Sequence, residues 1–166
     1  MIRVTIFWVL VGVVASGAGD LRASAKTLPS VAIRALDGGA VRLGEFKGKV
    51  VVVDFWASWC APCRVTFPAL NRMHEEFASK GVEVLAINVD ERRRDLDAFL
   101  AEQPHSMRVL LDPKGAATNA FNVRAVPTAF LIDRQGVIRF SHVGYTAAAL
   151  ESFRTEITSL LAESHD

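Results

Sequence analysis

Residues 50–63 read VVVVDFWASWCAPC, and this stretch decides how the chain folds. Its first part, Val50–Trp56, is short, β-branched and aromatic, which is typical of a buried strand. The residues after the second cysteine carry apolar side chains at helical spacing. The two cysteines of the chain, Cys60 and Cys63, are therefore expected on a turn between a strand and a helix.

The spacing of the two cysteines favours a redox pair. At a helix N-terminus, the Cys60 sulfur meets unpaired backbone N–H groups and the positive end of the helix dipole, which favour the thiolate over the thiol. A thiolate attacks disulfides, and Cys63 can then attack the mixed disulfide that Cys60 forms and release the product. We therefore predict that Cys60 is the nucleophile and Cys63 the resolving thiol.

Two other roles explain the cysteines less well. A purely structural disulfide between them would close a short loop and stabilise the fold by only about 2 kcal/mol, against about 5 kcal/mol for a long loop. A structural zinc site needs about four ligands, usually as two close pairs. The histidines of the chain are instead scattered singly, as His74, His105, His142 and His165. Neither a metal site nor a cofactor is expected.

Length and composition suit one folded domain after an N-terminal segment. The chain has 166 residues, 51% of them hydrophobic, which is enough for one substantial core. Residues 1–25 are expected to be a signal peptide or an N-terminal anchor, because Arg3 precedes the apolar segment Val4–Val14. This segment is shorter than the roughly 20 residues that span a bilayer comfortably, so both alternatives stay open. Residues 26–166 form the predicted domain.

The charge balance argues against a nucleic acid partner. Without residues 1–25, the chain has 17 basic and 17 acidic side chains and therefore no net charge. Its one basic run, Arg92–Arg94, is flanked by Glu91, Asp95 and Asp97, which is typical of a solvated start of a helix.

The remaining pattern predicts an α/β fold around a mixed sheet. A hairpin of residues 31–36 and 41–43 precedes the main fold, since Asp37-Gly38-Gly39 is a turn signal. Apart from residues 50–55, strands are expected at 82–89, 109–111, 128–132 and 137–142, and helices at 60–80, 92–103 and 116–121. Thr146 is expected to cap a final helix whose apolar side packs on the sheet.

The chain resembles the thioredoxin superfamily through its cysteine motif, the preceding VVDFWASW stretch and the later Val126-Pro127-Thr128. Three features are similar to the TlpA/ResA/DsbE-like extracytoplasmic branch: the export signal, the hairpin ending in residues 46–49, and an insert from Asp90 to Leu111. The resemblance covers residues 28–161. It implies a thioredoxin-like fold, with a mixed central sheet flanked by helices, an N-terminal hairpin and a central insert.

The resemblance also implies a surface that binds the substrate. Val126-Pro127-Thr128 resembles the cis-proline loop of the family, which lies beside the redox pair and presents backbone groups to an extended segment of the substrate. An ordinary trans proline is the alternative. Trp59 and the Ala61-Pro62 dipeptide are expected to contribute to the same surface.

Asp54 matches the buried acid of thioredoxins proper. Desolvation should raise its pKa, and a carboxyl that is partly protonated near neutral pH can accept the proton of Cys63. The alternative is a carboxyl at a strand end that reaches water. Many TlpA/ResA-like proteins carry an acid on the helix, three positions after the second cysteine, where this chain has Thr66. In this chain the acid has therefore moved from the helix to the strand.

These features predict an extracytoplasmic thiol-disulfide oxidoreductase, periplasmic in a bacterium and either free or anchored by residues 1–25. The resemblance suggests a reductase of client proteins in cytochrome c or copper-site maturation, recharged by a membrane electron donor of the DsbD/CcdA type. A disulfide oxidase or isomerase would use the same cysteines, and Ala61-Pro62 does not decide the direction.

Two further functions stay open. A copper carrier would bind Cu(I) through Cys60 and Cys63 as soft ligands, but the spacing offers no third ligand. A peroxidase on the same fold is compatible with the insert, but Ala57 stands where peroxiredoxins have the threonine of their Thr-x-x-Cys arrangement.

Overall fold

A seven-stranded mixed sheet lies at the centre of the described part of the chain, residues 28–163 of the computed structural model. The strands are β1 (Ala32–Ala35), β2 (Ala40–Arg42), β3 (Val50–Trp56), β4 (Val82–Asn88), β5 (Arg108–Leu111), β6 (Thr128–Ile132) and β7 (Ile138–Val143). Their order across the sheet is β2-β1-β5-β4-β3-β6-β7. Strands β3, β4 and β5 are parallel, and the other pairs are antiparallel.

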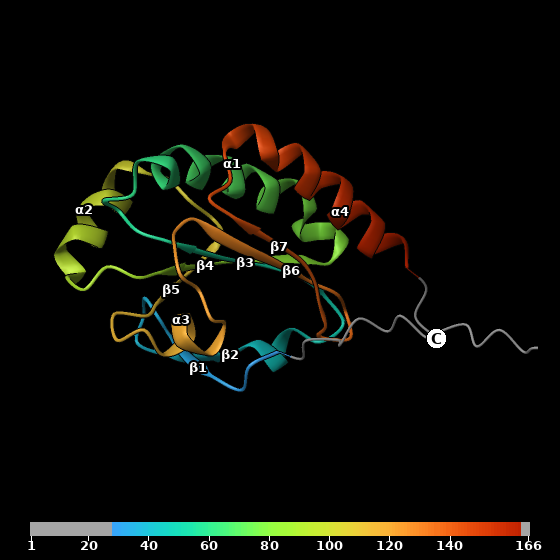
Figure 1. Ribbon diagram of the computed structural model, residues 1–166, viewed down its shortest axis with the longest axis horizontal. Coiled ribbons are helices and arrows are strands. Elements are labelled where there is room, and N and C mark those ends of the chain that lie inside the picture. Colours follow the sequence, from blue (N-terminus) through green and yellow to red (C-terminus); the bar gives the residue numbers. More distant parts are fainter. Residues whose placement is uncertain (1–27, 164–166) are drawn as a thin grey trace, which may run out of the picture.

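Helices cover both faces of this sheet (Figure 1). The α-helices are α1 (Ala61–Phe77), α2 (Arg93–Glu102), α3 (Ala116–Ala120) and α4 (Leu150–Ala162), and the 3-10 helices are η1 (Leu43–Phe46), η2 (Ala78–Lys80) and η3 (Ala147–Ala149). Helices α1, α2 and α4 lie on one face and α3 on the other. No helix within residues 28–163 combines the length and the apolar character needed to cross a membrane.

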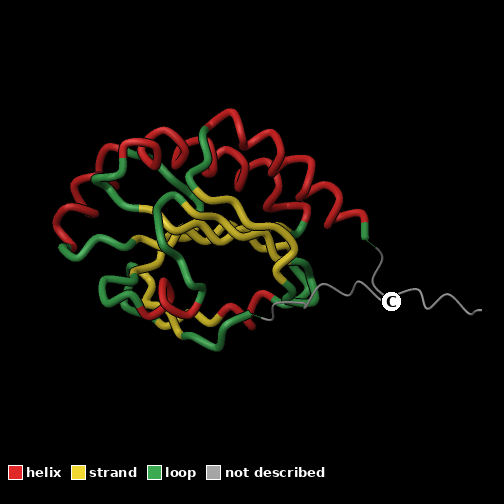
Figure 2. The backbone as a smooth tube through the Cα atoms, viewed as in Figure 1, coloured by secondary structure: helices red, strands yellow, loops and turns green. Residues whose placement is uncertain are grey.

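The hydrophobic core forms two layers, one on each face of the sheet. Alternate residues of a strand point to opposite faces, so β3 supplies both layers. Val52 and Trp56 pack with α1, α2 and α4, whereas Phe55 packs with Phe121 and Phe130 on the side of α3. Figure 2 shows the strands between the two sets of helices. The apolar run at the centre of the sheet is therefore buried on both faces.

Most predicted elements are confirmed. The hairpin forms as β1 and β2, with Ile33 opposite Val41, and the insert Asp90–Leu111 forms α2 and β5. The predicted cap at Thr146 is confirmed only in its position: Thr146 is the N-cap residue of η3, which leads directly into α4. Its side chain makes no cap hydrogen bond, and the N–H of Ala149 donates to its carbonyl at 3.0 Å, so the segment tightens into η3. Helix α4 therefore begins only at Leu150. The predicted signal or anchor at 1–25 lies outside the described residues.

One acidic residue interrupts the apolar strand β3. Asp54 is 1% exposed and lies opposite Ala86 of β4 and Ala129 of β6. The Tyr145 hydroxyl donates a hydrogen bond to its Oδ1 atom at 2.8 Å. Burial raises the pKa of Asp54 from 3.8 to about 7, and the hydrogen bond from Tyr145 opposes this rise. The alternative expectation, a carboxyl that reaches water, is wrong because neighbouring strands and helices enclose β3.

Burial of Asp54 predicts a dependence of stability on pH. Since its pKa is raised in the folded state, the carboxyl favours folding most below about pH 4, and stability falls as the pH rises through about 7. We expect Asp54→Asn to be more stable than the wild type by up to about 4 kcal/mol at pH 8, and about equally stable at pH 4. Urea unfolding of the oxidised proteins measures this difference.

The matched control is Asp97→Asn on the exposed surface of α2, where Asp97 pairs with Arg93. Its unfolding free energy should stay within about 0.5 kcal/mol of the wild type at both pH values. A difference between Asp54→Asn and the wild type that does not change with pH would contradict the prediction.

Candidate active site

The two cysteines lie at the N-terminus of α1, after β3 and a short loop. Cys60 is the N-cap residue, with extended backbone angles (φ −82°, ψ 106°), and its sulfur accepts a hydrogen bond from the N–H of Cys63 at 3.2 Å. Pro62 lies in the first turn, where its missing N–H disrupts no helical hydrogen bond. Cys60 and Cys63 form a disulfide with their Cα atoms 5.2 Å apart. The structure therefore represents the oxidised pair.

The two sulfur-bearing residues differ in their access to solvent. Cys60 is 5% exposed, whereas Cys63, in the first turn of α1, is completely buried. Trp59 is 70% exposed, and Ala61 and Pro62 are also exposed. A disulfide of another protein can therefore approach Cys60 across the surface formed by these three residues, while Cys63 can be reached only from within the pair.

The loop before the cysteines is tied to the end of β4. The backbone N–H of Ser58 donates to both carboxylate oxygens of Asp90, at 3.1 and 3.2 Å. Asn88 holds this carboxylate in turn, since its side-chain amide donates to Asp90 at 3.0 Å and its carbonyl oxygen accepts from the Asp90 N–H at 3.0 Å. Asp90 is buried. These bonds fix the backbone two residues before Cys60.

The Val126–Pro127 bond is cis, as the resemblance implied. Thr128 lies opposite Phe55 in the sheet, which places the Pro127 loop beside the end of β3 from which the cysteine loop starts. Thr128 is buried, and its hydroxyl donates to the carbonyl of Ala125 at 2.7 Å. The Pro127 carbonyl accepts from the N–H of Gly144 at 2.8 Å. The predicted loop and the cysteines thus share one edge of the sheet.

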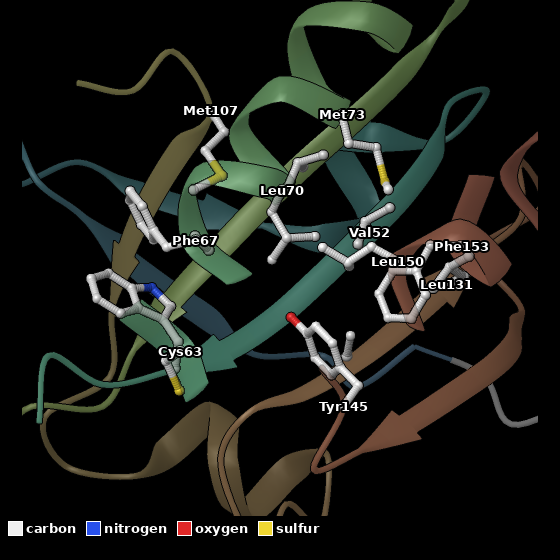
Figure 3. Close-up of a cluster of buried hydrophobic side chains, with 14 of the residues drawn as sticks. Val52, Cys63, Phe67, Leu70, Met73, Met107, Leu131, Tyr145, Leu150 and Phe153 are labelled. Carbon is white, nitrogen blue, oxygen red and sulfur yellow. The ribbon is translucent and has the colours of Figure 1, made fainter. Parts of the chain in front are cut away.

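Asp54 and the cysteines belong to the same face of the sheet. The side chains of Val52 and Trp56, two residues to either side of Asp54, join the core layer that also contains Cys60 and Cys63. Figure 3 shows Cys63 and Tyr145 in this layer, with the Tyr145 hydroxyl pointing into it. Tyr145 donates to Asp54, so a carboxyl with a pKa of about 7 lies in the layer beneath the redox helix.

Sequence reasoning missed two residues of this site, Asp90 and Tyr145. Asp90 had a usable signal, because it follows β4, and the carboxyl ends of neighbouring parallel strands meet at one edge of the sheet. Tyr145 had none. It is 91 residues away from Asp54, and nothing in the local pattern connects the two.

The residues do not form a ready metal site. Within residues 28–163, no group of three or more His, Cys, Asp or Glu side chains is arranged to hold a metal ion.

Comparisons with known proteins agree with this site. The family model described as AhpC/TSA matches residues 24–141. The thiol-disulfide oxidoreductase ResA of Bacillus thuringiensis subsp. konkukian (strain 97-27) is 33% identical over 134 residues, which cover 80% of this chain and 78% of that protein. The thioredoxin-like protein YneN of Bacillus subtilis (strain 168) is 34% identical over 119 residues, or 70% of this chain and 69% of YneN.

A solved structure has the same fold. The crystal structure described as a thiol:disulfide interchange protein DsbE from Chlorobium tepidum superposes with a TM-score of 0.79 and is 39% identical in sequence. The match covers 83% of this chain and 97% of that one. Across the ResA relatives, this chain spans between 66% and 78% of their length. The chain therefore belongs to the AhpC/TSA family and is, within its thioredoxin-like fold, a thiol-disulfide oxidoreductase of the ResA/DsbE-like kind.

Proposed function

We propose that the protein reduces disulfides of client proteins outside the cytoplasm, with Cys60 as the nucleophile, Cys63 as the resolving thiol and Asp54 as the proton acceptor. The observation that carries this proposal is the unequal access to the pair. Cys60 keeps 5% exposure next to the open indole of Trp59, whereas Cys63 is completely buried in the layer that contains Asp54. An outer sulfur suits attack on a foreign disulfide, and an inner one suits its resolution.

The reaction starts from the reduced pair. The Cys60 thiolate attacks one sulfur of the client disulfide, and the other client sulfur leaves as a thiolate. The Cys63 thiol then gives its proton to the Asp54 carboxylate, and the Cys63 sulfur attacks Cys60. The mixed disulfide breaks, and the client sulfur leaves as a second thiolate. Two electrons have passed to the client, and the Cys60–Cys63 disulfide remains.

The client surface of the proposal consists of Trp59, Ala61, Pro62 and the loop Val126-Pro127-Thr128. In this loop the backbone of Val126, rather than the Thr128 hydroxyl or the Pro127 carbonyl, is the part that can contact an extended client, because these two groups are already bonded within the domain. Such backbone pairing accepts many sequences. Client choice would then depend on side chains around Trp59.

The reducing direction and the location are inferred from the TlpA/ResA/DsbE-like resemblance. The same resemblance implies client proteins of cytochrome c or copper-site maturation. It also implies a membrane electron donor of the DsbD/CcdA type that returns two electrons to the Cys60–Cys63 pair. Residues 1–25 would export the domain to the periplasm or anchor it there.

The nucleophile and the resolving thiol can be separated by trapping. Pre-reduced Cys63→Ala should form a stable mixed disulfide with insulin, visible as a covalent mass increase that dithiothreitol removes, because no second thiol can resolve it. Cys60→Ala is the matched control and should form no adduct. The pre-reduced wild type should reduce about one insulin disulfide per chain. If the wild type leaves insulin intact, the proposal fails, and an adduct formed only by Cys60→Ala would reverse the two roles.

The direction of electron flow can be tested by the reduction potential of the pair. A reductase of this kind should have a potential below about −200 mV, since oxidising members of the superfamily lie above this value. Equilibration with glutathione or dithiothreitol buffers, followed by quantification of the two forms by mass, gives the value. A potential well above about −200 mV would instead favour a disulfide oxidase or isomerase.

The role of Asp54 can be tested with Asp54→Asn. We expect steady-state insulin reduction at pH 7.5 to slow by about tenfold or more, because Cys63 loses its proton acceptor. The rate at which Cys60 forms the mixed disulfide should not change. Rapid acid quenching and mass spectrometry follow both steps.

In the wild type, the rate of resolution should rise with pH through about 7, where Asp54 ionises, and in Asp54→Asn this rise should disappear. Asp97→Asn, remote on α2, is the control and should keep the wild-type profile. Unchanged steady-state reduction in Asp54→Asn would refute the proton-acceptor role.

A further inference from the structure

Tyr145 is a buried polar residue that the proposed reaction does not yet use. It is the only tyrosine of the chain, and it lies between β7 and η3, 5% exposed. Its ring packs against Phe153 of α4 with the centroids 5.0 Å apart. This packing directs the hydroxyl into the core layer rather than toward solvent (Figure 3).

The hydroxyl of Tyr145 lies between the proton acceptor and the redox helix. It donates to Oδ1 of Asp54 at 2.8 Å. The side chain of Thr66 on α1 lies near this hydroxyl, and it donates its own hydrogen bond to the carbonyl of Cys63 at 3.3 Å. Tyr145 and Thr66 are therefore the polar side chains between Asp54 and the backbone of the resolving cysteine. Thr66 occupies the helix position, three residues after Cys63, where many TlpA/ResA-like proteins carry an acid.

The phenol of Tyr145 stays protonated and acts as a hydrogen-bond donor, whereas the carboxyl of Asp54 titrates near neutral pH. Burial, reinforced by the nearby Asp54 carboxylate, raises the pKa of Tyr145 well above 10, so the phenol keeps its proton at the working pH. Burial raises the pKa of Asp54 to about 7, and without the hydrogen bond from Tyr145 this pKa would be higher still. The same hydrogen bond thus stabilises the ionised form of Asp54, which is the form that can accept a proton.

The other titratable groups that face this pair are few. On β4 and β6, Asp54 has only Ala86 and Ala129 as neighbours. On α1, the Cys60–Cys63 pair belongs to the core layer on the same face of the sheet. On β7, His142 lies opposite Ala129; its ring is 4.4 Å from that of Phe153, and it hydrogen-bonds Glu156 of α4 at 2.8 Å. Phe153 thus packs against both His142 and Tyr145. The side chain that hydrogen-bonds the Asp54 carboxyl is that of Tyr145.

We propose that Tyr145 is a positioning residue for thiol exchange: its hydroxyl holds the Asp54 carboxyl in place and keeps it ionised, and so able to accept a proton, near neutral pH. This inference rests on the proposed role of Asp54. Tyr145 keeps its own proton throughout, and no electron passes through it.

Tyr145→Phe removes the hydroxyl and keeps the ring. We expect the pH at which resolution of the mixed disulfide accelerates to move up by about one to two pH units, the effect of losing one hydrogen bond to a charged group. At pH 7 resolution should slow by about tenfold, and near pH 9 it should approach the wild-type rate. A role in packing alone would slow the reaction equally at all pH values, and that result would overturn the inference.

The single tyrosine permits a second test of opposite sign. Biosynthetic replacement of tyrosine by 3,5-difluorotyrosine alters only position 145, and its more acidic phenol donates a stronger hydrogen bond. The profile should then move to lower pH. An unchanged or upward-moving profile would contradict the proposal. Since this replacement keeps the hydroxyl and its hydrogen bond, the test also serves if Tyr145→Phe does not fold.

A titration without turnover gives an independent measurement. Carbon-13 NMR of the Asp54 carboxyl in the oxidised proteins should show the same upward shift in Tyr145→Phe and downward shift in the fluorinated protein. Phe153→Leu is the packing control: it disturbs the ring beside Tyr145 and should lower stability while leaving the titration of Asp54 close to that of the wild type.

The outcomes separate the two proposals. If Asp54→Asn keeps the wild-type pH profile, Asp54 is not the proton acceptor and both proposals fail. If Asp54→Asn loses the rise with pH but Tyr145→Phe keeps it at the wild-type pH, the proton acceptor stands and only the role of Tyr145 is refuted. In the Asp54→Asn background, adding Tyr145→Phe should change the profile no further.

Discussion

Strand β3 is held on both edges and on both faces, and the rest of the site depends on this constraint. Hydrogen bonds join it to β4 on one side and β6 on the other, and the core layers cover it above and below. A strand enclosed in this way cannot shift its register, because a shift by one residue would turn its side chains to the wrong face. It therefore fixes where Asp54 is buried and where the chain leaves the sheet to form the Cys60 loop.

Burying a carboxyl in such a strand lowers the stability of the fold and makes the carboxyl more reactive, and desolvation is the cause of both effects. Desolvation disfavours the charged form of Asp54, which weakens the fold at neutral pH and raises the pKa of the carboxyl toward the pH at which the enzyme works. A group with such a pKa exchanges protons most effectively. The conflict is characteristic of functional sites, where stability is commonly lower than the fold could provide.

The insert between β4 and β6 supports the redox helix directly. Asp90 holds the loop before the cysteines, and Phe99 of α2 packs its ring on Trp56 at 4.8 Å and on Phe67 of α1 at 5.1 Å. Further along α1, the Asn71 side chain accepts hydrogen bonds from the N–H groups of Ser106 and Met107. The insert thus contacts α1 near its start and near its middle, and it steadies the element that carries both cysteines.

The sequence by itself determined the elements and the chemistry. The β-branched run, the turn glycines and the helical spacing after Cys63 are local signals, and they located β3, α1, the N-terminal hairpin and the insert to within a few residues. The Cys-x-x-Cys spacing indicated thiol exchange for the same reason, since both thiols belong to one turn. Thr146 stands at the start of the last helical segment, but its side chain does not cap α4, because the 3-10 turn of the alanines after it comes first.

Only the tertiary structure decided which distant groups meet. The bonds of Tyr145 to Asp54 and of Asp90 to Ser58 join segments far apart in the chain, and their partners are brought together by strand order and by packing of α4 on the sheet. Desolvation of Asp54 likewise requires all of the strands and helices around it. The raised pKa of Asp54 could therefore not be located from the residues next to it in the sequence alone.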